Sequence, residues 1–175
     1  MDYIWSYIEL TLNNISYKLF NISNPNFFMT PILESEIQLS SEVTEEDLAS
    51  AIEDEFGVLY SKDGKRLLKC KSTLKTYSIS NNTEVIYDRA FDFCNSLQQI
   101  EIPDSVKYIG DSAFIYCKTL KQIVLPDSLI TIGKGMLVGS KSLQSIIVPK
   151  YKTDRYKNLL KYSNCDLSII KEQDD

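Results

Sequence analysis

The stretch IGDSAFIYCKTLKQIVLP, residues 109–126, recurs along the chain at a constant offset of 23 residues. Three copies align without gaps, over residues 85–105, 107–128 and 130–149. Apolar residues hold the same columns in every copy, and a proline closes each copy. The columns are Phe91, Phe114 and Leu137, then Leu97, Leu120 and Leu143, then Ile100, Ile123 and Ile146, then Ile102, Leu125 and Val148, and finally Pro103, Pro126 and Pro149.

A fixed period of this length with recurring aliphatic residues predicts a solenoid of stacked turns. One turn cannot bury its apolar face alone, so each turn packs against its neighbours and the core runs through the stack. The run Leu-x-x-Ile-x-Ile-Pro predicts one short strand per turn, which ends at the proline because proline lacks an N–H group. On the opposite wall, the small Ala113 allows close approach and Phe114 fills the core.

These repeats resemble the leucine-rich repeats of BspA-like bacterial surface proteins, on the residues IPDSVKYIGDSAFIYCKTLKQIVLP and their shifted copies. The resemblance covers roughly residues 76–150. It implies an α+β fold, a leucine-rich repeat solenoid with a short parallel concave sheet. It also implies a hairpin over residues 57–70 that opens the solenoid, for which Asp63-Gly64 is a strong turn signal.

A C-terminal helical cap over residues 149–170 is the other element that the resemblance implies. Thr153 or Asp154 is expected to cap a short helix at its N-terminus. The helix is expected to cover the last turn with three side chains, which are Tyr156, Leu159 and Leu160. We therefore divide the chain into an irregular N-terminal region (1–56), the solenoid with its hairpin (57–150) and the C-terminal cap (151–175).

The N-terminal region does not repeat. YIELTL and ISYKLF flank Asn13-Asn14, which indicates a hairpin, and a helix over residues 3–20 is the competing interpretation. Thr44 and the acidic residues after it predict the start of a helix that runs to about Glu53. The region either covers the N-terminal end of the solenoid or serves as a docking element.

The net charge of −5 is distributed unevenly. Residues 1–60 hold eleven acidic residues and one basic residue, whereas residues 61–175 hold eighteen basic and thirteen acidic residues. The acidic balance argues against nucleic acid as a partner. No run approaches the ~18 apolar residues of a membrane span, so we predict no membrane insertion. The first residues lack the pattern of a secretory signal, so we expect a cytoplasmic protein, or an extracellular one if a signal was removed.

Catalytic chemistry is not predicted. The sequence contains no histidine, which removes the commonest general base and the commonest zinc ligand. Cys94 and Cys117 share a column with Ser140, which predicts buried rungs about 5 Å apart. Cys70 and Cys165 have no matching spacing. We therefore predict no catalytic residue, no metal site, no disulfide and no cofactor.

The concave face supplies the first candidate binding site. Side chains alternate along a strand, so residues beside the inward isoleucines point outward. The predicted partner-binding residues are Gln99, Glu101, Gln122, Val124, Ser145 and Ile147, and Thr76 and Ser78 extend the two rows. Val124 and Ile147 adjoin in a β-branched patch, which is either a partner site or ordinary surface.

An acidic segment supplies the second candidate. Residues 34–55 hold nine acidic residues and no basic ones. The segment is either a solvated face or a contact for a basic partner. Its predicted partner-binding residues are Glu45, Glu46, Asp47, Glu53, Asp54 and Glu55.

The function predicted from these patterns is non-enzymatic protein binding by a monomer, because the resemblance implies a repeat fold of a kind that mostly binds proteins. The partner is expected to be another protein. Two alternatives stay open: a fragment of a surface adhesin, and an immunity or anti-defence inhibitor that blocks a basic site on a partner enzyme.

Overall fold

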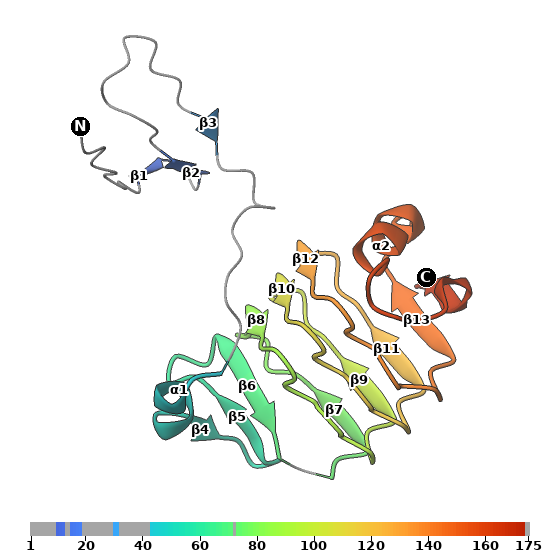
Figure 1. Ribbon diagram of the computed structural model, residues 1–175, viewed down its shortest axis with the longest axis horizontal. Helices are drawn as coiled ribbons and strands as arrows, with labels where there is room; N and C mark the ends of the chain where they lie inside the picture. The colour runs from blue at the N-terminus through green and yellow to red at the C-terminus, as the bar shows by residue number, and fades with distance from the viewer. Residues whose placement is uncertain (1–9, 13–14, 19–29, 32–42, 72, 174–175) are drawn as a thin grey trace, which may run out of the picture. The chain divides into compact units, whose positions relative to one another are not determined.

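The computed structural model describes residues 10–12, 15–18, 30–31, 43–71 and 73–173 (Figure 1). The chain divides into two compact units, Met1–Ser40 and Ser41–Asp175. The second unit contains the repeats together with part of the region that we placed before them. The predicted limits at 56 and 150 stay predictions.

The first unit contains a small antiparallel sheet with strand order β1-β2-β3. Its strands are β1 (Leu10–Leu12), β2 (Ile15–Lys18) and β3 (Thr30–Pro31). β1 and β2 pair as a hairpin, with Leu10 opposite Tyr17 and Leu12 opposite Ile15. The competing interpretation, a helix over residues 3–20, is therefore wrong over the described part of this segment. Residues 13–14 and 19–29 lie outside the described residues.

The second unit is a solenoid whose turns each contribute strands to two sheets. The five-stranded sheet has the order β14-β13-β11-β9-β7, and Figure 1 shows β7, β9, β11 and β13 stacked in chain order. Its strands are β7 (Thr76–Ser78), β9 (Gln99–Glu101), β11 (Gln122–Val124), β13 (Ser145–Val148) and β14 (Ile170–Glu172). All of its pairings are parallel. The predicted solenoid is confirmed.

The second sheet has six strands in the order β12-β10-β8-β6-β5-β4. Its strands are β4 (Ile52–Glu53), β5 (Val58–Tyr60), β6 (Arg66–Cys70), β8 (Val85–Ile86), β10 (Tyr108–Ile109) and β12 (Thr131–Ile132). We expected only one strand per turn. A second one forms because the Tyr108-Ile109 column also meets its copies in register, Val85-Ile86 on one side and Thr131-Ile132 on the other.

The core follows the repeat columns. Ile100, Ile123 and Ile146 are fully buried, one above the other along the five-stranded sheet. Phe91 and Phe114 stack with ring centroids 4.9 Å apart and an interplanar angle of 12°. Such aromatic stacking contributes beyond the burial of area, by roughly 0.5–1.5 kcal/mol. In the isoleucine column, the middle turn makes the same contact with the turn before it and with the turn after it.

Left-handed backbone recurs at two repeat columns. Arg89, Ser112 and Gly135 form one column, with φ of 53°, 55° and 64°. Phe93, Tyr116 and Gly139 form the other, with φ of 56°, 56° and 75°. Glycine adopts this region without strain, so the third copy relaxes both positions. At Gly139 a Cβ would lie 2.2 Å from the ring of Tyr116, and glycine therefore also leaves room for that ring.

The N-terminal end of the solenoid is closed by a helix and hairpins. α1 (Glu45–Ala49) has Thr44 as its N-cap and Ser50 as its C-cap, and the Ser50 hydroxyl donates back to the Glu46 carbonyl oxygen at 2.9 Å. The prediction that this helix runs to about Glu53 is wrong, because Ile52 and Glu53 pair antiparallel with β5 instead. β5 and β6 form the expected hairpin, which is closed where the Gly64 N–H donates to the Ser61 carbonyl at 2.8 Å.

The C-terminal end is covered by α2 (Thr153–Leu159). Tyr156 and Leu160 are buried against the last turn and Leu159 packs beside them, as predicted. The predicted cap is wrong: Lys152 holds the N-cap position without a side-chain hydrogen bond. Thr153 instead donates to Oε1 of Glu172 at 2.7 Å, because the strand that follows α2 brings a carboxylate within its reach.

After α2 the chain supplies the backbone hydrogen-bond partners that one more turn of the solenoid would supply. The Leu137 N–H donates to the Ser163 carbonyl at 3.0 Å, where Phe114 of the previous copy donates to Met136 at 2.9 Å. A short 3₁₀ segment (Leu167–Ile169) then leads into β14, which pairs with β13. The last repeat therefore keeps its backbone partners although the sequence repeat has ended.

Candidate protein-binding surface

Two rows of side chains face outward along the five-stranded sheet. Strand pairing aligns the first row, which is Thr76, Gln99, Gln122 and Ser145. It also aligns the second row, which is Ser78, Glu101, Val124, Ile147 and Lys171. In β7, β9 and β11 the central residue is buried and its two neighbours are not. The structure therefore places all six predicted residues of this face on one surface.

The second row changes character along its length. Ser78 and Glu101 are polar, Val124 and Ile147 are apolar and partly exposed, and Lys171 is basic. The Ser78 hydroxyl donates to Oε2 of Glu101 at 3.2 Å, which orients that carboxylate. The row therefore presents a small apolar patch with an acid on one side and a base on the other.

Lys171 was not among the predicted residues. It pairs with Ile147 across β13 and β14, but it follows Ile147 by 24 residues rather than by the repeat period. The only signal was the apolar triplet before it, Leu167 with Ile169 and Ile170. Without the period, that triplet does not place a strand.

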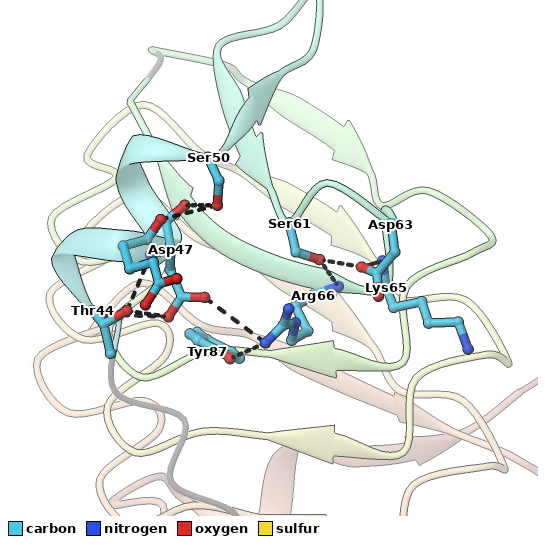
Figure 2. A network of polar contacts seen from close by, with 9 residues as sticks. Thr44, Asp47, Ser50, Ser61, Asp63, Lys65, Arg66 and Tyr87 are labelled. Atoms are coloured by element: carbon cyan, nitrogen blue, oxygen red, sulfur yellow. Dashed lines mark hydrogen bonds and ion pairs between the residues drawn. The ribbon is translucent and has the colours of Figure 1, made fainter.

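Three of the six predicted acidic residues, Asp47, Glu53 and Asp54, have partners within the protein. Figure 2 shows Asp47 between Thr44 and Arg66. The Thr44 N–H and hydroxyl donate to Oδ2 of Asp47 at 3.2 Å and 2.8 Å, and the Arg66 guanidinium lies 3.8 Å from Oδ1. The hydrogen bonds from the Thr44 side chain and backbone hold the pKa of Asp47 below its ordinary value, and Arg66 adds to this. Arg66 also donates to the Tyr87 hydroxyl at 3.2 Å, so the network ties α1 to the solenoid.

Asp54 and Glu53 also have internal partners. Asp54 accepts hydrogen bonds from the N–H groups of Phe56 and Val58 at 2.9 Å and 2.8 Å, and from the Tyr77 hydroxyl at 2.6 Å. Glu53 lies 3.6 Å from Lys71. Glu45, Glu46 and Glu55 are exposed. Of the six predicted acids, these three are the ones for which the described residues provide no ion pair or hydrogen bond to the carboxylate.

The cysteine column is structural. Cys70, Cys94 and Cys117 are buried, and none of the four cysteines forms a disulfide in the structure. The Cys117 thiol donates to the Phe91 carbonyl at 3.1 Å, and the Ser140 hydroxyl makes the equivalent contact with Phe114 at 2.8 Å. Burial raises the pKa of Cys117 to about 12. Such a thiol is a poor nucleophile at neutral pH, because the thiolate is the reactive form.

A groove with a volume of about 780 Å³ lies where the strands of the five-stranded sheet end. Ser78, Glu101 and Val124 of the second row form part of its wall. The rest of its lining comes from the residues after each strand, including Pro103, Pro126 and Pro149. The repeating prolines were visible in the sequence, but nothing in the period indicated that a groove follows them.

In residues 43–71 and 73–173, together with the described strands before them, no group of three or more acidic, cysteine or histidine side chains is placed to hold a metal ion. No helix in the described part of the chain is long and apolar enough to span a bilayer.

Comparisons with known proteins agree with this geometry. The family model described as BspA type Leucine rich repeat region (6 copies) matches residues 64–173. Among solved structures, a leucine-rich repeat protein from Eubacterium ventriosum ATCC 27560 is similar with 23% identity and a TM-score of 0.54, covering 63% of this chain and 30% of that one. A leucine-rich repeat protein from Bacteroides ovatus ATCC 8483 has 29% identity and a TM-score of 0.47, covering 54% of this chain and 24% of that one.

This chain therefore spans less than a third of the length of either solved structure. A comparison with curated protein sequences finds no match. The family model covers more than half of the chain, and the strand registers repeat at the period that the sequence shows. The chain belongs to the BspA-type leucine-rich repeat family.

Proposed function

We propose that this protein is a non-enzymatic binding module that holds another protein against the outward face of its five-stranded sheet. The observation that carries the proposal is the second row, in which Val124 and Ile147 lie side by side between Glu101 and Lys171. Protein interfaces combine an apolar centre with a polar, charged rim. The row has this arrangement on a rigid sheet, where the side chains are held in fixed order.

A binding role agrees with the chemistry of the chain. The sequence has no histidine. A hydrogen bond with Cys70 and burial raise the pKa of Cys94, and burial raises the pKa of Cys117. The flanking Glu101 and Lys171 favour a partner whose charges are complementary, which governs specificity and association rate more than affinity.

The acidic segment contributes less to the proposal than the sequence predicted. Three of its six candidates, Asp47, Glu53 and Asp54, already have partners within the protein. Removing any of them from these partners would carry a cost that binding must offset. The adhesin and inhibitor alternatives stay predictions.

The test places a photocrosslinking amino acid at Gln122, in the middle of the first row, and in a second variant at Thr131. Thr131 is a matched control, because it is an exposed strand residue of the following copy on the other sheet. Cells of the source organism expressing each variant are irradiated, and crosslinked proteins are identified by mass spectrometry. We expect a protein that crosslinks at Gln122 and not at Thr131.

The crosslinked protein is then purified and its affinity is measured directly. Ile147→Asp is expected to raise Kd by about thirtyfold or more, since a charge at the centre of an interface costs on the order of 2 kcal/mol. Thr131→Asp is expected to leave Kd unchanged. Equal Kd values for Ile147→Asp and the natural chain, with both folded by circular dichroism, would show that this face is not the binding site.

A further inference from the structure

The groove at the ends of the five-stranded sheet carries an inference about the partner's chemistry. It crosses the turns, from Ser78 and Asn81 at one end to Gln173 at the other. Its apolar floor comes from Ile79, Ile102 and Leu125, which are nearly fully buried, together with the prolines. Each turn therefore contributes an equivalent set of groups to one continuous channel.

Some residues of this channel have backbone carbonyl groups that receive no hydrogen bond within the described part of the chain. At the last turn, the Gln173 N–H donates to the Val148 carbonyl at 2.8 Å. In the preceding turns a proline holds the position of Gln173, and proline has no N–H to donate. The carbonyl oxygens of Ile79, Ile102 and Leu125 accordingly receive no hydrogen bond from any described residue. Backbone carbonyl groups are usually paired with protein or with water, so these three are acceptors that a donor on a bound partner can use.

The charged groups that line the groove also favour a ligand that donates hydrogen bonds and carries positive charge. Its ionisable lining consists of Glu101, Asp104 and Asp127, and no lysine or arginine lines it. Asp127 is compensated by Lys152 and Arg155, each 3.7 Å away. Glu101 and Asp104 make no ion pair with the described residues. The Oγ atom of Ser105 is buried there and likewise has no partner within the described chain.

We propose that the groove holds an extended segment of the partner protein that carries lysine or arginine side chains. Ammonium and guanidinium groups are donors only, so they satisfy the carbonyl row and the carboxylates together. Adjacent strands lie about 4.8 Å apart, so the acceptors recur along the groove within reach of the long, flexible side chains of a segment that lies in it. The inference rests on the proposed function, because it names the chemistry of the protein that the sheet would hold.

The test uses two fluorescein-labelled nonapeptides with the purified full chain at low ionic strength. One alternates arginine with serine and the other alternates glutamate with serine. Fluorescence anisotropy is expected to show binding of the arginine peptide only. Amide chemical shifts of the ¹⁵N-labelled chain are expected to move at Asn81, Asp104, Ser105 and Gln173. Absence of binding, or shifts confined to other surfaces, would overturn the proposal.

A charge-neutralising pair identifies the carboxylates. Glu101→Gln with Asp104→Asn is expected to raise Kd for the arginine peptide at least tenfold. Glu45→Gln with Asp154→Asn is the matched control, because it removes the same charge from two exposed residues that do not line the groove. If the two double variants raise the Kd for the arginine peptide equally, the peptide binds through the overall charge of the protein and not through the groove. That result would overturn the proposal.

A separate variant tests the carbonyl row without changing any charge. Pro103→Ala supplies an N–H group that can pair with the Ile79 carbonyl, so the peptide loses one acceptor. We expect Kd to rise several-fold while the chain stays folded. An unchanged Kd would remove the carbonyl row from the site.

The two proposals fail in distinguishable ways. If the arginine peptide binds the groove but no protein crosslinks at Gln122, the groove inference stands and the proposed function fails. Suppose instead that a partner protein no longer binds the Ile147→Asp variant but binds the Glu101→Gln, Asp104→Asn variant with normal affinity. The proposed function then stands and the groove inference fails. Gln122 and Ile147 do not line the groove, so their substitution leaves it intact.

Discussion

The Tyr77 hydroxyl donates a hydrogen bond of 2.6 Å to Oδ2 of Asp54, joining the first strand of the five-stranded sheet to the turn before β5. Because Tyr77 gives its proton to Asp54, the Tyr60 hydroxyl, 2.6 Å away, is the donor to Tyr77. The ring of Tyr77 lies between Phe56 and Phe91. One side chain thus connects the N-terminal hairpins to the aromatic core of the repeats.

Tyr77→Phe is expected to lower the free energy of unfolding by about 1–3 kcal/mol. The substitution keeps the ring but removes the acceptor of the Tyr60 hydroxyl and the donor to Oδ2 of Asp54, and loss of a hydrogen-bond partner in a partly buried position costs this much. Urea unfolding monitored by circular dichroism measures the change. Tyr151→Phe is the control, since Tyr151 is 88% exposed. Equal stability of the two variants would mean that the Tyr60–Tyr77–Asp54 chain does not hold the end of the solenoid.

The lowered pKa of Asp47 predicts how the free energy of unfolding depends on pH. Its pKa is lowered in the folded protein, below its ordinary value of 3.8, so the unfolded chain binds the proton more readily. The stabilisation is therefore complete above about pH 4 and is lost as the pH falls through the folded-state pKa. Asp47→Asn should be less stable than the natural chain at pH 6, and this difference should shrink towards pH 2.5.

The measurement is urea unfolding of both chains at several values of pH. Glu45→Gln is the control, because Glu45 lies in the same helical turn but receives no capping hydrogen bond from Thr44. A stability difference between the Asp47→Asn and natural chains that stays constant down to pH 2.5 would contradict the assignment of the capping box as its source.

The two hydrogen bonds of the Ser140 hydroxyl predict which side chains can replace it. Ser140→Ala removes the donor to the Phe114 carbonyl and the acceptor of the Cys117 N–H, a contact of 3.1 Å. Unfolding should become easier by about 1–3 kcal/mol, because both backbone groups are buried. Ser140→Cys introduces the side chain that the previous copy has in this column, at Cys117. It should lower the free energy of unfolding by about 1 kcal/mol or less. Thermal and urea unfolding compare them, and an equal loss from both would contradict a role for the hydrogen bond.

The thiols should react in a fixed order. Cys117 is completely buried and its pKa is raised to about 12, whereas Cys165 is only half-buried. Iodoacetamide at pH 7 is therefore expected to modify Cys165 first, and Cys70, Cys94 and Cys117 only after unfolding. Mass spectrometry of the digested chain reads the order. In Cys165→Ser the native protein should take up almost no label, and rapid labelling of that variant would contradict the burial of the column.

The interior of the solenoid could be predicted from sequence because each contact is local to the period. Ile100 meets Ile123 and Ile146 since the same column returns every turn. The alternation of strands then determines that Gln122 and Val124 face outward. Neither step needs a partner from elsewhere in the chain, so neither needs a structure.

The acidic candidates show where such prediction stops. Asp47 and Asp54 were predicted from charge alone, and charge does not reveal which donors approach a carboxylate. Arg66 and Tyr77 reach them from strands that lie 19 and 23 residues further along. Likewise, the helix after Thr44 ends early because pairing with β5 competes with helix formation, and this pairing follows no repeat.

By itself, the sequence determined the repeating turn, its register, its buried columns and its outward rows, because a residue pattern of fixed period encodes contacts between equivalent positions. The tertiary structure alone decided the two ends and the groove. At the ends, non-repeating segments supply the partners that a further turn would have supplied. In the groove, prolines of successive turns leave carbonyl groups unpaired beside Glu101 and Asp104, a juxtaposition that exists only once the turns are stacked.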